Sequence, residues 1–223
     1  MFFDPAQVGM RPEPFKYTVY NALVVPRPIG WISTLSTDGV VNLAPFSFFN
    51  SLCANPPCVM YCPNSFKPGT EEPKDSLVNV EATGEFVFNL CTYEQREQMI
   101  ITAAASPASW DEMEAAGITP APCEKVKPPR VKDSPVVLEC KYLQTVHLPT
   151  AKDGSRQNVI IGEVVGIHVD DDAIVDGKID IRKVNPLARL GYLDYATLDM
   201  DNLFSMRPPE VDPRYSLSGT KGG

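Results

Sequence analysis

Residues 44–51 hold the densest set of side chains suited to ligand chemistry in this chain. They read APFSFFNS, so small, hydroxyl and amide side chains alternate with three phenylalanines. A proline stands near the start of the run and Pro56–Pro57 follows it, which predicts an irregular segment that is neither helix nor ordinary strand. An apolar segment with exposed hydroxyls and free backbone N–H groups suits a flat aromatic ligand that carries a phosphate.

Four polar residues in and before this segment are candidate ligand contacts. The hydroxyls of Ser33, Thr34 and Ser47 can donate to phosphate or to alcohol oxygens, and the Asn50 amide can both donate and accept. A structural interpretation stands beside this one. Ser33 and Thr34 would then be ordinary strand residues, and Ser47 and Asn50 would only fix a loop.

A lysine lies where a helix is predicted to begin. Lys74 directly precedes Asp75, a good N-cap, and an anion is favoured at a helix N-terminus. Arg27 and Lys67 are second choices for a phosphate contact. In the structural interpretation Lys74 is a solvated charge and Asp75 only caps the helix.

Several other site chemistries are not supported by a motif. The chain contains no GxxxxGK[ST], no GxGxxG and no GxSxG. Its six cysteines form no CxxC pair, and only His147 and His168 accompany them, so we expect no metal site. The paired carboxylates at 71–72 and 170–172 lie in turn-like sequence and are read as solvated charges.

Composition narrows the class of protein. The chain has 223 residues, of which 43% are hydrophobic and 22% charged, as in globular proteins. A net charge of −8 argues against nucleic acid, whose phosphates are bound by Lys and Arg. No signal-peptide pattern and no apolar run of ~20 residues is present, so we expect no membrane segment and a cytoplasmic location with reduced thiols.

The predicted elements arrive mostly as hairpins. Strands are expected over 29–36, 40–43, 57–62, 85–91, 136–148 and 158–170, with Asp-Gly turns at 38–39, 153–154 and 176–177. Helices are expected over 75–83, over 93–104 behind a Thr92/Gln95 capping box, and from Ser109 to Gly117. Antiparallel hairpins with inserted helices favour a barrel over βαβ repeats.

Five segments, in order, resemble the flavin reductase-like family. They are RPIGWIST at 27–34, APFSFFNS at 44–51, KDS at 74–76 with EATGEFVFNL at 81–90, IGEV at 161–164 running to His168, and RLG at 189–191 with Tyr195. A second glycine is expected at 192, where this chain has Tyr192.

The resemblance implies an FMN-binding split β-barrel, mainly antiparallel and of Greek-key type, that works as a homodimer with the flavin near the subunit interface. It also implies NAD(P)H as the electron donor of a flavin reductase, with a redox partner or a flavin-dependent monooxygenase receiving the electrons. The alternatives are an FMN electron-transfer protein of the flavoredoxin type and a non-enzymatic FMN-binding module. The implied cofactor contacts are Arg27, Trp31, Ser33, Thr34, Ala44, Pro45, Phe46, Ser47, Phe49, Asn50, Ser51, Lys74 and Asp75. For Trp31, a core aromatic is the interpretation that the sequence favours.

The chain divides into an aromatic N-terminal arm at 1–23, a domain at 24–195 and a polar tail at 196–223. His168 is predicted to share a strand face with Gly162 and Gly166, where another group approaches closely. It is a weak candidate proton donor, and a satisfied core or interface histidine is the alternative. No nucleophile is required, because hydride chemistry belongs to a flavin.

Overall fold

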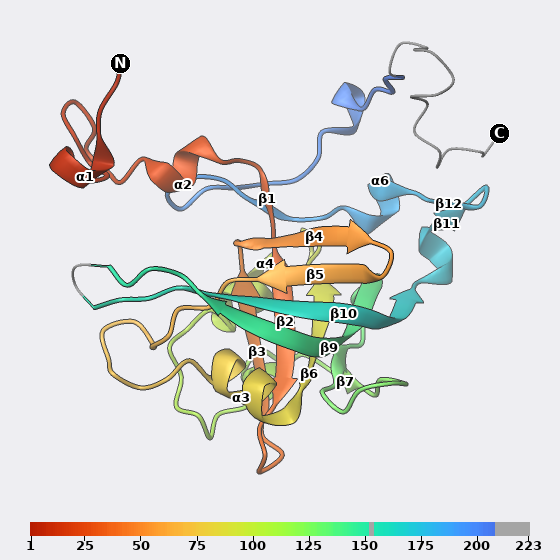
Figure 1. The fold of residues 1–223 in the computed structure, drawn as a ribbon. Coiled ribbons are helices and arrows are strands. Elements are labelled where there is room, and N and C mark those ends of the chain that lie inside the picture. The colour runs from red at the N-terminus through yellow and green to blue at the C-terminus, as the bar shows by residue number, and fades with distance from the viewer. Residues whose placement is uncertain (152–153, 208–223) are drawn as a thin grey trace.

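The computed structural model describes residues 1–151 and 154–207. Its main feature is a seven-stranded antiparallel sheet of order β3-β2-β6-β9-β10-β5-β4. The sheet turns over on itself, so β4 and β5 run across the direction of β2, β3 and β6 (Figure 1). These strands are β2 (Gly30–Leu35), β3 (Val41–Phe46), β4 (Phe49–Ala54), β5 (Pro57–Tyr61), β6 (Glu85–Leu90), β9 (Val136–His147) and β10 (Asn158–Val169). The predicted mainly β fold is confirmed.

The remaining elements are short. The helices are α1 (Pro5–Val8), α2 (Tyr20–Leu23), α3 (Asp75–Thr83), α4 (Arg96–Ile101), α5 (Glu112–Ala115) and α6 (Ile181–Val184), with 3₁₀ turns η1 (Asp171–Ala173) and η2 (Met200–Asn202). Three small sheets pair β1 (Arg27–Pro28) with β13 (Ala188–Arg189) and β14 (Tyr195–Ala196), β7 (Pro120–Ala121) with β8 (Arg130–Val131), and β11 (Ile174–Val175) with β12 (Lys178–Ile179). Within the described ranges, no helix has the length and apolar character needed to cross a membrane.

The sheet separates two hydrophobic clusters, because side chains alternate between its faces. The interior cluster includes Ile32 and Phe86, and α3 closes it with Leu77 and Val80. The outer cluster includes Trp31 together with Leu43, Met99, Met113 and Leu187, and α4 and α5 cover it.

The arm at 1–23 lies against the segment that follows β13. The rings of Tyr17 and Tyr192 meet edge to face with centroids 5.6 Å apart. Gly191 is buried against Ala22, whose Cβ would lie 2.4 Å from a Cβ at position 191. Tyr192 takes a left-handed φ of 56°, a conformation that glycine adopts more easily, at the position where a second glycine was expected. Residues 208–223 of the predicted tail, and Asp153 of the predicted 153–154 turn, lie outside the described residues.

The prediction of an irregular 44–51 segment is wrong. β3 continues to Phe46 and β4 begins at Phe49, so only residues 47–48 leave the strand pattern. Pro45 is tolerated because β3 is an edge strand. The N–H of Leu43, two residues earlier on the same side, points away from β2 and is accepted by Glu112 Oε2 at 3.0 Å. A backbone N–H at position 45 would likewise point away from β2, so a proline there removes no hydrogen bond between β2 and β3.

Helix boundaries also differ from the prediction. The N-cap of α3 is Lys74 rather than Asp75, because the Asp75 carboxylate pairs with Lys67 instead of capping the helix. The Thr92/Gln95 contact is present, with Gln95 Oε1 accepting the Thr92 N–H at 3.1 Å, but α4 is shorter than predicted. Asp111, not Ser109, caps α5.

The predicted common face of Gly162, Gly166 and His168 is wrong for Gly162, whereas Gly166 and His168 do share a face. The β9–β10 register shifts between Val164 and Gly166, which reverses the side on which later residues point. Gly162 lies against the Phe86 ring in the interior, whereas Gly166 lies against Glu139 on the other face.

Candidate functional site

A buried polar network joins β2, β3, α3 and α5. The Thr34 hydroxyl accepts a hydrogen bond from Asn79 Nδ2 at 3.1 Å and lies 3.5 Å from Asn42 Oδ1. The Asn42 amide donates to Glu112 Oε2 at 3.0 Å, and Ser106 Oγ donates to Glu112 Oε1 at 2.5 Å. The network satisfies the buried Glu112 carboxylate and holds α3, through Asn79 in the middle of the helix, against β2 and β3.

Two lysines lie beside this network, and they differ in how their charge is used. Lys67 is 5% exposed, and its Nζ contacts Asp75 Oδ2 at 3.0 Å and the Ser106 carbonyl at 2.8 Å. The Lys74 ammonium has neither a hydrogen bond nor an ion pair in the described part of the chain. Burial lowers the pKa of Lys74, and the nearby carboxylates of Asp75 and Glu112 oppose that shift. Of these two lysines, Lys74 is the one whose charge is available to an added anion.

The first turn of α3 leaves polar groups without partners. The Ser76 side chain is fully buried, and its Oγ has no hydrogen-bond partner among the described residues. Lys74, at the N-cap, makes no side-chain cap bond, and the nine-residue helix directs its first N–H groups outward. A buried hydroxyl without a partner is costly in a folded protein. Together with Lys74 it forms a donor set that fits a phosphate.

The other predicted phosphate contacts are used within the chain. Ser33 is fully buried, and its Oγ donates to the Pro129 carbonyl at 2.6 Å. Arg27 donates to the carbonyls of Asn21, Val24 and Leu190, which fastens the arm and the β13–β14 turn to β1. Burial, followed by the charge of Arg189, lowers the pKa of Arg27.

Four predicted contacts belong to the hydrophobic core. Ala44, Phe46 and Phe49 lie in the interior cluster, where Phe49 stacks on Phe88 with centroids 4.5 Å apart and an interplanar angle of 5°. Trp31 lies in the outer cluster, fully buried, and its Nε1 donates to Thr102 Oγ1 at 2.9 Å.

A second group of predicted contacts remains accessible near the β3–β4 corner. Pro45 and Ser47 are partly exposed, while Asn50 and Ser51 are exposed. Asn50 Oδ1 accepts the Ser51 N–H at 2.9 Å, which leaves the Asn50 amide N–H₂ directed to solvent. The structure therefore divides the predicted site into this corner and the start of α3, at opposite ends of β3.

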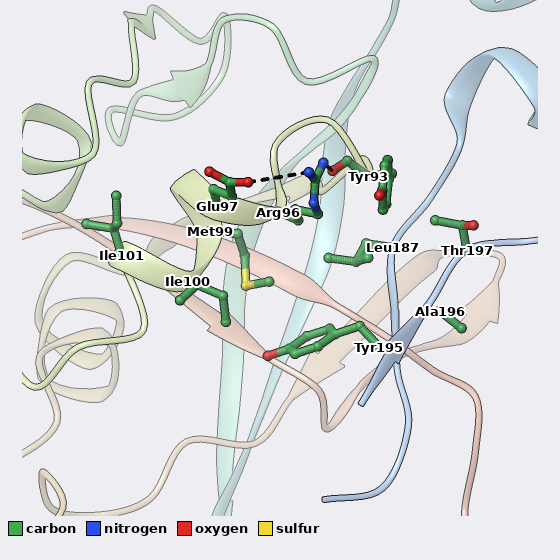
Figure 2. A pocket seen from close by; sticks show the side chains of 10 residues that line it. All are labelled: Tyr93, Arg96, Glu97, Met99, Ile100, Ile101, Leu187, Tyr195, Ala196 and Thr197. Carbon is green, nitrogen blue, oxygen red and sulfur yellow. Dashed lines mark hydrogen bonds and ion pairs between the residues drawn. The ribbon is translucent and has the colours of Figure 1, made fainter. Parts of the chain in front are cut away.

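A groove of about 720 Å³ lies along α4, which packs against β3. Its lining is Tyr93, Arg96, Glu97, Met99, Ile100, Ile101, Leu187, Tyr195, Ala196 and Thr197 (Figure 2). Arg96 lies 4.1 Å from the centroid of the Tyr93 ring, and its guanidinium faces Glu97. None of the predicted site residues lines the groove, although Tyr195 was quoted in the family resemblance.

The sequence held one signal for this groove. Ile100 and Ile101 are adjacent apolar residues at the end of a short helix, and both are about half exposed. Adjacent residues of a helix point in different directions, so both isoleucines cannot face the core. At least one of them must therefore lie on an apolar part of the surface. A smaller hollow of about 390 Å³ lies on the other side of α4, near Gln98 and Ile118.

His168 forms its hydrogen bond with Glu139 of β9 and not with a residue of the β3–β4 corner. Its Nε2 lies 2.5 Å from Glu139 Oε1, and Glu139 also accepts the N–H groups of Glu124 at 2.8 Å and Lys125 at 2.6 Å. The prediction of a satisfied histidine agrees with this environment.

Comparison with known proteins identifies the class of this chain. The family model for the flavin reductase like domain matches residues 22–186. An uncharacterized protein from Aquifex aeolicus is 41% identical over 177 residues, which cover 78% of this chain and 86% of the relative. Nitrilotriacetate monooxygenase component B from Bacillus cereus has a similar structure, with a TM-score of 0.81, 29% identity, and coverage of 92% of this chain and 98% of that one.

A further solved structure, described as a candidate flavin reductase with a split barrel domain from Shewanella frigidimarina, has a TM-score of 0.75 and 28% identity. The alignment covers 95% of this chain and 100% of that chain. The fold is therefore a split barrel, and the chain belongs to the flavin reductase like domain family.

Proposed function

We propose that this protein binds FMN and reduces it with NAD(P)H. The observation that carries the proposal is the start of α3, where the Ser76 hydroxyl and the Lys74 ammonium lack partners among the described residues in a member of a flavin reductase family. A phosphate would give the Ser76 hydroxyl an acceptor and the Lys74 charge a counter-ion.

The proposed ring site combines the β3–β4 corner with the groove on α4, the helix that packs against β3. Pro45 and the groove residues Met99 and Tyr195 offer apolar surface for a planar ring system. Ser47 and Asn50 offer polar groups for its edges. The groove volume falls within the range of small-molecule sites, roughly 300–1,000 Å³.

The bound flavin supplies the hydride chemistry. The side chains of this chain bind and orient: Lys74 and Ser76 hold the anionic end, and the corner residues fix the ring edges. Thr34 and Glu112 act indirectly, because they hold α3 and β3 in place through Asn79 and Asn42.

A second candidate function is electron transfer, with FMN bound permanently and reduced by a protein partner instead of NAD(P)H. It is supported by the likeness to nitrilotriacetate monooxygenase component B, a protein whose name describes it as one component of a monooxygenase. In either case we propose a flavin-dependent monooxygenase or another redox protein as the receiver of electrons.

We further propose a homodimer in the cytoplasm, with a domain at 24–195 flanked by the arm and the tail. Large apolar side chains of both flanking segments are exposed, among them Phe2 of the arm and Phe204 of the tail, and Leu193 near the end of the domain is exposed as well. A partner surface would cover them. Six free cysteines agree with a reducing compartment.

The test is the colour of the purified protein and its response to NADH and NADPH. Flavin binding predicts a yellow protein, or one that turns yellow and quenches flavin fluorescence when FMN is added. Bleaching of the flavin absorbance by NADH or NADPH under nitrogen supports the reductase. A yellow protein that neither nucleotide bleaches would overturn the reductase in favour of the electron carrier, and a protein that binds no FMN would overturn both.

A further inference from the structure

Three side chains from distant parts of the chain meet on the sheet face opposite to the interior cluster. The ligand-type atoms of Cys123, Glu139 and His168 all lie within 4.8 Å of one another. Glu139 belongs to β9 and His168 to β10, while Cys123 lies in the 119–135 loop that covers this face between β7 and β8. The β10 register shift is what turns His168 toward Glu139.

The carboxylate of this trio is rigidly held. Glu139 is fully buried, and the N–H groups of Glu124 and Lys125 bind one oxygen each. A Cβ at position 166 would lie 3.2 Å from the Glu139 carboxyl carbon, so the glycine there leaves just enough room for the group. Fixed ligands reduce the entropy lost when a cation binds.

The other two side chains border solvent. His168 is 26% exposed in its side chain, and Cys123 is partly exposed. A cation can therefore enter from this side, and a water molecule can complete its coordination. Burial and the neighbouring Glu139 carboxylate raise the pKa of the Cys123 thiol to about 12, and Arg130 opposes this shift only in part, so Cys123 is a thiol until a cation displaces its proton.

We propose that Cys123, Glu139 and His168 bind a borderline-soft divalent cation of the Zn²⁺ class. One thiolate, one imidazole and one carboxylate is a donor set that Zn²⁺ accepts, at about 2.3 Å to sulfur and 2.0–2.2 Å to nitrogen and oxygen, with a fourth position for water. Hard cations such as Mg²⁺ prefer oxygen ligands alone and are disfavoured.

Binding exchanges one proton at sulfur for one metal bond. The Cys123 S–H proton leaves to solvent and the thiolate binds the cation. The proton that His168 Nε2 donates to Glu139 moves to Nδ1 through solvent, so the neutral imidazole binds the cation through Nε2. The hydrogen bond is thereby replaced by two metal bonds, and the two atoms move apart to admit the ion. No electron is transferred, because Zn²⁺ is redox-inert.

The consequence is a cross-link between the 119–135 loop and two strands of the sheet. The loop also supplies the Pro129 carbonyl that accepts from Ser33, and the Val131 N–H that donates to Asn89 Oδ1 at 2.8 Å. A cation at Cys123 would hold this loop on β9 and β10, away from the proposed flavin corner. The site is a stabilising one and does not depend on the proposed function.

The spacing of the ligands explains why the sequence did not predict the site. Cys123, Glu139 and His168 lie in a loop and two strands, without the short intervals that mark zinc motifs. The topology alone brings them together.

The experiment uses Co²⁺ as a spectroscopic substitute for Zn²⁺. Chelator-treated full-length protein is titrated with Co²⁺ under nitrogen, and the near-ultraviolet thiolate-to-cobalt absorption is recorded. We expect one equivalent to bind and Zn²⁺ to displace it. The Cys123→Ser variant should lose the band, and His168→Asn should bind at least about tenfold more weakly, as expected when a ligand is removed.

The matched controls are Cys53→Ser, which removes an exposed thiol, and His147→Asn, which removes the other histidine. Both should keep the band. Zn²⁺ at a hundredfold excess over its Kd should raise the melting temperature of the wild type by roughly 5–10 °C and leave that of Cys123→Ser unchanged.

A missing cobalt–thiolate band in the wild type would overturn the proposal. So would a band that survives in Cys123→Ser, or one that Cys53→Ser abolishes. Circular dichroism of each variant at 20 °C separates a lost ligand from a lost fold, and a Cys123→Ser protein that is folded yet binds no Co²⁺ is the supporting result.

Discussion

Gly30 lies directly against the ring of Phe49: a Cβ at position 30 would come within 2.5 Å of Phe49 Cδ2 and 2.9 Å of Phe49 Cβ. Phe49 in turn stacks on Phe88 of β6. The contact joins β2 and β6 to β4, the strand at the opposite end of the sheet order. A residue without a side chain at 30 is therefore what allows the sheet to turn over on itself and close the interior.

A methyl group at position 30 should loosen this closure. Gly30→Ala is expected to destabilise the protein by ~1–3 kcal/mol, the usual cost of overpacking, because Phe49 is confined by Phe88 and cannot withdraw. Urea denaturation followed by fluorescence measures the change. In a Phe49→Ala background the cost of Gly30→Ala should shrink. An equal cost in both backgrounds would show that the ring is not the obstacle.

If the start of α3 binds the phosphate, a change there should alter the affinity for FMN but not the affinity for riboflavin. Lys74→Ala should weaken FMN about ten- to a hundredfold, since a charge-assisted bond contributes ~1.5–3 kcal/mol. Riboflavin, which lacks the phosphate, should bind with nearly unchanged affinity. Fluorescence quenching titrations give both dissociation constants.

Two further variants sharpen this test. Lys132→Ala removes an exposed lysine of the 119–135 loop and should leave both affinities unchanged. Ser76→Ala should also weaken FMN selectively, without destabilising the unliganded protein, because its hydroxyl has no partner there within the described chain. Equal losses for FMN and riboflavin in Lys74→Ala would remove Lys74 from the phosphate site.

The interactions of Glu85 should make the free energy of unfolding depend on pH in the acid range. Burial alone would raise the pKa of Glu85, but hydrogen bonds from the Lys141 ammonium and the Lys127 N–H outweigh burial and lower the pKa. A carboxyl whose pKa is lower in the folded state contributes stability above its unfolded pKa, near 4.3, and loses it as pH falls through the folded value.

The free energy of unfolding should therefore fall less steeply below about pH 4.3 in Glu85→Gln than in the wild type. Urea titrations at a series of pH values measure this slope. Glu71→Gln, which changes an exposed carboxylate, is the matched control and should follow the wild type. A Glu85→Gln curve parallel to that of the wild type would contradict the assignment.

The sequence predicted the long strands well, because hydrophobic alternation is a local signal. The span of β6, with Phe86 and Phe88 pointing inward, and the β9–β10 hairpin both follow from it. The face of His168 did not follow, because one extra residue near Val165 reverses the alternation and no local signal marks it.

The site was predicted less well, for a different physical reason. Hydroxyl and aromatic side chains suit a ligand and a protein interior equally, so composition cannot tell the Ser33 contact with Pro129 from a contact with phosphate. Phe46 and Phe49 are likewise core residues of a barrel that closes through them. Lys74 was singled out because a helix start has its own local signal, and its role at a phosphate stays a prediction. The α4 groove was missed because it depends on how distant elements meet.

The exposed apolar residues of the arm and of the segment after β13 predict a dimer. Phe2 is 92% exposed and Leu193 is 85% exposed, and a partner surface would cover such large apolar side chains. Sedimentation velocity of dilute protein should give the mass of two chains. Leu193→Glu places a charge in the proposed contact and should shift the equilibrium toward monomer, while Val78→Glu, on the exposed face of α3, should not.

If the flavin site includes both chains, the Leu193→Glu monomer should also bind FMN more weakly than the wild type at equal chain concentration. A monomeric wild type that binds FMN fully would exclude a shared site and leave the whole flavin contact to the residues of one chain.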